Sequence, residues 1–296
     1  MKQKKERTFN VRNAFFFTNL LIFSLLICSS CSNESLDLNE DLQEVSTIPE
    51  KFSKLLTDLS LDANEVRYIE SLDAIAHGDI LYSADTNSDE NIEKAHWHNR
   101  RVSRANSRNI NYTVRGVNSA NYIAAIDQAA QAWENMSPNI NFTRVSNNAN
   151  GIDLTISFLN AADYARVDNS GSGAFATFPT GNGNIGNRIS FNESSFRNTF
   201  NSWKILLTIH EIGHTLGFRH PNQGGGVAIP CAGSQQWHQN NPAGSVMNSA
   251  LPWGNWPSQN ISVAQWASRN KGWTLTDRYI IDWAYELAGN NDPVCN

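Results

Sequence analysis

The sequence has few cysteines, few methionines and a long stretch without histidine, and each scarcity limits what the chain can be. It contains four cysteines and three methionines in 296 residues, and no histidine lies between His98 and His210. A net charge of −5 and an isoelectric point near 5.8 argue against a general nucleic-acid-binding protein. Hydrophobic residues make up 40% of the chain, which is enough to form one sizeable core.

The N-terminus has the features of an export signal. A cluster of basic residues precedes an apolar stretch from Ala14 to Ile27, which is too short to span a bilayer as a helix but suits a signal-peptide core. Small residues then lead to Cys31, as they do at bacterial lipoprotein cleavage sites. We therefore expect residues 1–31 to be a lipoprotein-type signal, with Cys31 lipidated and the protein anchored to a bacterial outer membrane. The alternative is an ordinary cleaved signal peptide and free secretion.

Without that leader the chain keeps two cysteines, Cys231 and Cys295. In an oxidising compartment they are a candidate disulfide. It would close a long loop and stabilise the fold by a few kcal/mol, roughly. Two unrelated buried thiols are the alternative.

The clearest pattern is the stretch from His210 to His220. His210 and His214 are four residues apart, so on a helix both imidazoles lie on one face and can bind one metal ion. Glu211 follows the first of them and can reach a metal-bound water without being a ligand itself, as in the H-E-x-x-H arrangement of zinc proteases. The spacing thus predicts a zinc site on a helix.

Gly217 indicates where that helix ends. A glycine three residues after His214 suits a helix that stops in a left-handed conformation, and the resulting turn would bring His220 back as a third ligand. Three protein ligands and an open position are typical of a catalytic zinc site rather than a structural one.

The full pattern H-E-x-x-H-x-x-G-x-x-H calls for a methionine-containing turn further along the chain, and Met247 is the one methionine that follows it. On these residues the chain resembles the metzincin clan of zinc peptidases, and the literal HEIGH stretch with the leader resembles the bacterial HEIGH metallopeptidases. The resemblance implies an α+β fold with a twisted mixed sheet, an edge strand that can pair with a peptide, a long active-site helix and a small C-terminal subdomain with the Met-turn. Met247 would then form a hydrophobic floor under the metal.

The same resemblance divides the chain. Residues 32–105 are expected to be a tether and pro-segment, and residues 106–296 a catalytic domain similar to those of matrixins and astacins. Within it, residues 106–217 would form the N-terminal subdomain and residues 218–296 the C-terminal one. Matrixins carry histidine or aspartate ligands for a structural zinc and for calcium at three positions that here are occupied by Phe175, Ser190 and Asn192. One catalytic zinc is therefore expected, a second zinc is not, and calcium is left open.

Two features of residues 32–105 bear on activation. Gly78-Asp79 before a strand-like run resembles the aspartate switch of astacin-like enzymes, in which a pro-segment aspartate binds the catalytic zinc. Asp79 is thus a candidate latency ligand, and an ordinary turn aspartate is the alternative. Arg100-Arg101 lies in a polar stretch that a trypsin-like enzyme could cut, or that is simply a solvated linker.

Apolar periodicity predicts the elements of the catalytic domain. We expect strands at 110–115, 140–145, 152–158 and at the end of 185–192, and helices at 122–136 and, for the active site, 196–217. A helical pattern also runs over 51–73, and two closing helices are expected at 262–270 and 277–287.

Together these features predict an exported zinc endopeptidase acting on proteins or peptides, with Glu211 as general base. The membrane partner would be the lipid anchor, nucleic acid is not an expected partner, and oligomeric state is left open. The competing interpretation is a surface-anchored, zinc-containing binding protein, and a variant of the first is a peptidase specific for glycoproteins.

Overall fold

A computed structural model describes residues 48–59, 61–83, 102–116, 119–167, 173–180, 182–220 and 245–247. The chain divides into two compact units, 1–45 and 46–296, and all of the described residues belong to the second. Cys31, Cys231, Cys295 and the two helices expected after residue 261 lie outside the described residues. Among the helices that are described, none has both the length and the apolar character needed to cross a membrane.

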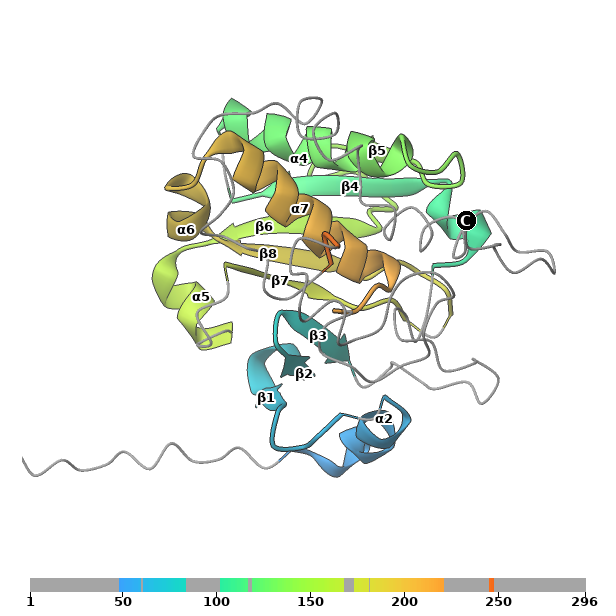
Figure 1. The fold of residues 1–296 in the computed structure, drawn as a ribbon, viewed down its shortest axis with the longest axis vertical. Helices are drawn as coiled ribbons and strands as arrows, with labels where there is room; N and C mark the ends of the chain where they lie inside the picture. Colours follow the sequence, from blue (N-terminus) through green and yellow to red (C-terminus); the bar gives the residue numbers. More distant parts are fainter. Residues whose placement is uncertain are drawn as a thin grey trace, which may run out of the picture. The chain divides into compact units, whose positions relative to one another are not determined.

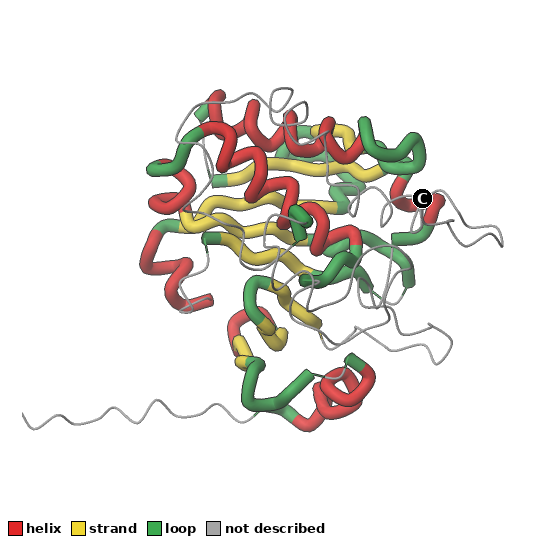
Figure 2. Tube along the Cα trace, viewed as in Figure 1, coloured by secondary structure: helices red, strands yellow, loops and turns green. Residues whose placement is uncertain are grey.

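The strands of the described part form one mixed sheet of eight, which confirms the α+β class predicted above (Figure 2). Four neighbouring pairs are parallel, namely β4–β5, β4–β6, β6–β8 and β3–β7, and the other three are antiparallel. In spatial order the strands are β1 (Arg67–Ile69), β2 (Ala74–His77), β3 (Ile80–Ser83), β7 (Ala174–Thr177), β8 (Arg188–Asn192), β6 (Leu154–Leu159), β4 (Ile110–Arg115) and β5 (Phe142–Arg144).

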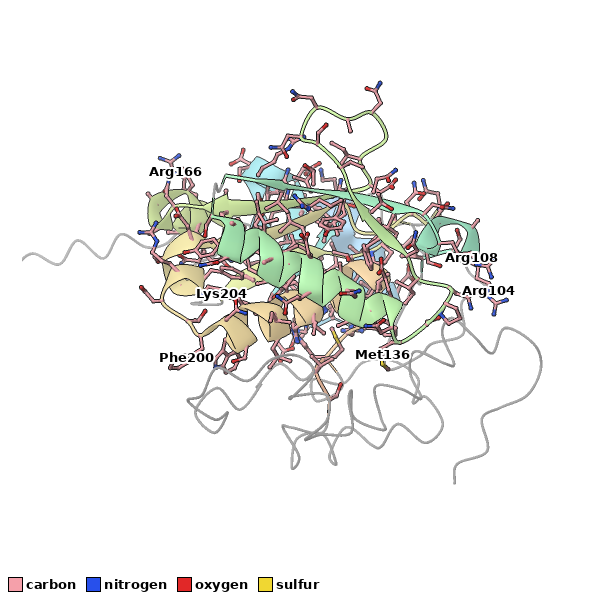
Figure 3. The ribbon with its side chains drawn as sticks, turned by 90° about the horizontal axis from the view of Figure 1, so that it is seen from above. Arg104, Arg108, Met136, Arg166, Phe200 and Lys204 are labelled. Atoms are coloured by element: carbon pink, nitrogen blue, oxygen red, sulfur yellow. The ribbon has the colours of Figure 1, made fainter. Side chains whose placement is uncertain are left out.

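Two helices, α4 (Ala120–Glu134) and α7 (Asn201–Leu216), cover one face of the sheet (Figure 1). The view from above places both on the same side of the strands, with Met136 and Phe200 labelled near their ends (Figure 3). The remaining described helices are short: η2 (Glu50–Phe52), α2 (Ser53–Asp58), η3 (Glu70–Leu72), α3 (Arg104–Ser107), α5 (Ala161–Val167) and α6 (Glu193–Arg197).

The main core lies between these two helices and the sheet. Along α4 the apolar residues recur at helical spacing, so that Ile126, Ala129 and Trp133 are all buried. Strand β6 instead alternates buried and half-buried residues, as a strand with one face on the core should. Burial of this apolar surface fixes α7, and with it the histidines, against the sheet.

Residues 48–83, which we call the N-terminal segment, extend the same sheet beyond β7. Strand β3 runs parallel to β7, and the N–H groups of Ala176 and Phe178 donate to the carbonyls of Asp79 and Leu81 at 2.9 Å. The side chain of Phe178 is part of an apolar cluster built mostly from the N-terminal segment. A second cluster joins Leu81 to Tyr164 and Phe175, among others. The segment is therefore attached by both backbone pairing and apolar packing.

Two predicted helices have different bounds in the structure. The helix expected over 51–73 ends at Asp58, because Asp62 accepts the Asn64 N–H in a turn and residues 67–69 form a strand. The active-site helix expected over 196–217 is broken into α6 and α7. At the break the Thr199 hydroxyl donates to the Phe196 carbonyl and the Lys204 ammonium donates to the Thr199 carbonyl, which satisfies the backbone there without a continuous helix.

The three positions compared with matrixin metal ligands have structural contacts here. Phe175 packs against Tyr164, and the Ser190 hydroxyl lies 3.0 Å from that of Ser157. Asn192 caps α6 by accepting the N–H groups of Ser194 and Ser195.

Gly186 connects the sheet to the active-site helix, and a side chain there should disrupt the fold. A β-carbon on Gly186 would lie 1.8 Å from the Thr177 carbonyl oxygen and 3.1 Å from the α-carbon of Thr215, both backbone atoms. We expect Gly186→Ala to lower the free energy of unfolding by about 2–4 kcal/mol. Urea unfolding of Gly186→Ala and of Gly173→Ala would check this.

Gly173 is the matched control, since the nearest atom to its added β-carbon is a Leu207 methyl at 3.8 Å. Equal unfolding midpoints for the two variants would contradict the prediction.

Candidate metal centre

Helix α7 carries the first two histidines of the motif on one buried face. His210 is 2% exposed and His214 is 0% exposed. Their rings meet edge to face with centroids 4.6 Å apart, one helical turn from each other. The sequence spacing therefore produces the expected juxtaposition.

Gly217 ends the helix in the left-handed conformation that the sequence predicts. Its φ is 106°, its N–H donates to the His214 carbonyl and the N–H of Phe218 donates to the Gly213 carbonyl. These two bonds are the Schellman pattern of a glycine-terminated helix. The turn returns the chain so that His220, 1% exposed, faces the other two histidines.

The three Nε2 atoms converge on one point. They are 3.0 Å apart between His210 and His214, and 3.1 Å from each of these to His220. The Nδ1 of His210 lies 2.6 Å from the Val246 carbonyl, and that of His214 lies 2.7 Å from the Phe218 carbonyl. Because a carbonyl only accepts, Nδ1 carries the proton in both rings, and Nε2 presents a lone pair.

This donor set fits a zinc ion. Neutral imidazole lone pairs at these separations repel one another unless a cation lies between them, and carbonyl-bound Nδ1 protons are the usual outer support of zinc-binding histidines. The chemistry of the cluster therefore agrees with the catalytic zinc expected from the sequence.

Asp79 of the N-terminal segment lies at the same point. It occupies the two-residue turn between β2 and β3, where Gly78 has a φ of 62°. Its carboxylate oxygens lie 3.0 Å from the Nε2 of His220, 3.3 Å from that of His214 and 3.5 Å from that of His210. Four candidate ligand atoms, three nitrogens and one oxygen, are thus gathered in one group.

The protonation states also suit a metal. Burial lowers the pKa of His214 to about 4, so its imidazole is neutral at physiological pH. Burial alone would raise the pKa of Asp79, but interactions with His220, His214 and His210 outweigh it and hold that pKa well below the ordinary value. A neutral imidazole and an ionised carboxylate are the forms in which both groups bind a divalent cation.

The remaining predicted site residues lie around the cluster. Glu211 is 1% exposed and directly follows His210. Met247, 2% exposed, packs under the helix, where a β-carbon on Gly213 would be only 2.3 Å from its sulfur. The structure thus brings together the three histidines and Asp79, with Met247 against Gly213 of the same helix and Glu211 buried next to His210 in the chain. The three cysteines singled out from the sequence fall outside the described residues.

Sequence reasoning missed several groups that support the site. The carbonyls of Val246 and Phe218 hold the histidine rings, but every residue has a carbonyl, so no sequence signal marks them. Trp133 lies in the helix predicted over 122–136, and its indole N–H donates to the Ile209 carbonyl at 3.0 Å while its ring stacks on Phe218. Arg219 was not singled out at all.

Comparison with known proteins agrees with this geometry. The profile of the Matrixin family matches residues 96–242, and that of a family described as Met-zincin matches residues 205–294. The chain carries a metzincin-type metallopeptidase domain. Matrix metalloproteinase-18 of Xenopus laevis is 31% identical over 108 residues, which are 36% of this chain and 23% of that protein. The metzincin family implies a catalytic zinc, and the three histidines with Asp79 form a group that could hold a metal ion.

Two solved structures are also similar to the chain. Myroilysin is 17% identical with a TM-score of 0.36, over 75% of this chain and 98% of that one. High choriolytic enzyme 1, a hatching-enzyme zinc protease of the medaka fish Oryzias latipes, is 18% identical with a TM-score of 0.27, over 42% of this chain and 50% of that one.

The turn at Gly217 should determine zinc affinity. Gly217→Ala forces a β-carbon into the left-handed conformation at a cost of about 1 kcal/mol, and it should displace His220. We expect zinc affinity, measured by competition with a chelator, to fall by about 10- to 100-fold.

Gly151→Ala is the matched control, because Gly151 also has a positive φ, of 71°, but no atom within 4 Å of its added β-carbon. It should show a similar backbone cost and unchanged zinc affinity. Equal zinc affinity for both variants would refute a positioning role for the turn.

Proposed function

We propose that the protein is an exported zinc endopeptidase of the HEIGH type, synthesised in a latent form in which Asp79 binds the zinc. The observation that carries the proposal is the convergence of three histidine Nε2 atoms at 3.0–3.1 Å beside a buried Glu211. Export, and anchoring through a lipidated Cys31, are supported by the basic and apolar leader in the sequence.

His210, His214 and His220 would hold the zinc. When bound, zinc polarises the scissile carbonyl and makes a nearby water more acidic. Glu211 is the general base: its carboxylate takes a proton from the attacking water and passes it to the nitrogen of the leaving amine. Met247 and the Val246 carbonyl support the helix and the His210 ring from below.

The substrate is a protein or peptide bound in extended form along the edge of β7. In the latent form that edge is occupied by β3, to which Ala176 and Phe178 donate their N–H groups. Once the N-terminal segment is released, the same donors are available to a substrate backbone, which binds there as an added strand.

The general base is tested by exchanging one carboxylate. The full-length protein is cut with trypsin, and the trypsin is then blocked with a serine-protease inhibitor. Under these conditions we expect Glu211→Gln to hydrolyse casein about 10²–10⁴-fold more slowly than the native protein. Zinc content should remain about one ion per chain, since Glu211 is not a ligand.

Glu193→Gln on α6 is the control, because Glu193 forms an ion pair with Arg197 on the same short helix and should tolerate the change. Normal turnover by Glu211→Gln would refute the mechanism. Zinc in both the native protein and the Glu211 variant, with hydrolysis by neither, would favour a binding protein.

The latency ligand is tested in the uncut protein. Asp79→Ala removes one of four candidate ligands and should raise activity by about tenfold or more, a shift of at least about 1.4 kcal/mol in favour of the open site. The rise should remain below the activity of the native protein after trypsin treatment, because β3 still occupies the edge of β7.

Asp62→Ala removes an exposed aspartate of the same segment that is not part of the metal-ligand group, and should have no effect on activity. Unchanged activity in Asp79→Ala that retains its zinc would show that Asp79 does not impose latency.

A further inference from the structure

Arg219 lies between Phe218 and His220 and is 3% exposed, although arginine is rarely buried without a partner. Its Nη1 donates to the carbonyl of Leu59, at the end of α2, over 3.3 Å. Its charge also acts on two further residues of the N-terminal segment. Burial lowers the pKa of His77 most, and the positive charge of Arg219 lowers it further. Burial raises the pKa of Tyr82, and the charge of Arg219 opposes that rise. The guanidinium therefore faces the N-terminal segment.

Another part of the same segment follows the path expected for a substrate. Asp79 lies at the three histidines, and Tyr82 lies three residues further along β3, which is paired with β7. His77 is on the neighbouring strand, opposite Ile80. Arg219 thus faces the segment whose Asp79 lies at the metal centre and whose strand β3 covers the edge of β7.

Release of the segment changes the surroundings of Arg219. The Leu59 carbonyl, Tyr82 and His77 all leave together, whereas Arg219, which directly precedes His220 in the chain, stays. A cation at the wall of a partly dehydrated groove attracts a carboxylate strongly, and the planar guanidinium can donate two parallel hydrogen bonds to it.

We propose that Arg219 is a specificity-determining residue, which selects substrates with an aspartate or glutamate within about three residues of the scissile bond. This inference rests on the proposed peptidase function and on release of the N-terminal segment. It names the substrate class of that site: acidic peptides bound in extended form along β7.

The test uses the full-length protein activated by limited trypsin treatment, with trypsin then inhibited. Quenched fluorescent peptides are made in matched pairs that differ only by Glu or Gln at one position, for the three positions on each side of the scissile bond. For the native enzyme we expect kcat/KM to favour Glu over Gln by about 10- to 100-fold at one position, and this ratio to fall as salt is raised.

Variants then assign the preference to Arg219. The Glu/Gln ratio should fall to about 1 in Arg219→Gln, be partly retained in Arg219→Lys and invert in Arg219→Glu, which should prefer Lys at that position. Because each ratio is measured on one preparation, a lower fraction of zinc-loaded enzyme cancels. Arg166→Gln, a surface arginine of α5 with a side chain 78% exposed, is the control and should keep the native ratio.

Several outcomes would overturn the inference. A native ratio near 1 at every position, or an unchanged ratio in Arg219→Gln, would show that Arg219 only anchors the N-terminal segment. If Arg219→Gln does not fold, two other measurements test the inference: the Glu/Gln ratio of the native enzyme with its salt dependence, and the Glu/Gln ratio of Arg219→Lys. Cleavage of all peptides without acidic preference refutes this inference alone, whereas cleavage of none refutes the peptidase function as well.

Discussion

Three imidazole lone pairs directed at one point repel each other, and much of the described structure serves to hold them there. The Nε2 atoms lie 3.0–3.1 Å apart in a buried site, where no bulk water weakens the repulsion. A bound cation replaces this repulsion with attraction to each nitrogen, so metal binding stabilises the arrangement. Rigid support of each ring is therefore needed before the metal binds, and that support comes from three separate parts of the chain.

Each support has a distinct physical origin. Helix α7 sets the distance between His210 and His214, and burial of its apolar residues against the sheet fixes the helix. The Gly217 turn sets the direction of His220. The Val246 carbonyl, from the turn that contains Met247, fixes the His210 tautomer. A glycine at 213 lets Met247 approach the helix closely enough for that carbonyl to reach the ring. The metal site thus ties the Met-turn to the active-site helix.

Much of this was predictable from the sequence because it depends on short-range spacing. The interval between His210 and His214 and the position of Gly217 are local facts, and both had the predicted consequence. Strand β4 was predicted with its observed bounds for the same reason: its apolar alternation is regular. The fold class followed from the metzincin resemblance.

What could not be predicted depends on distant contacts or very short elements. Strand β1 has three residues, too few for a periodicity to show, and an Asx turn before it replaces the expected helix. The break between α6 and α7 depends on bonds of Thr199 and Lys204 that compete with a helical pattern. Arg219 reaches Leu59 from 160 residues away, so nothing near it in the sequence indicates its partner.

In the latent form that we propose, two separate features of the N-terminal segment block substrate binding: Asp79 coordinates the metal, and β3 occupies the edge of β7. The carboxylate of Asp79 acts only at the histidines, whereas β3 is held by backbone bonds to β7, and apolar packing around Phe178 and Phe175 attaches the segment to the domain. Those apolar contacts do not depend on the charge of Asp79, so loss of the carboxylate frees a metal position but leaves the groove filled. Full access requires the whole segment to leave, and the same departure removes the Leu59 carbonyl from Arg219. Activation and acidic-substrate recognition would therefore arise from one event.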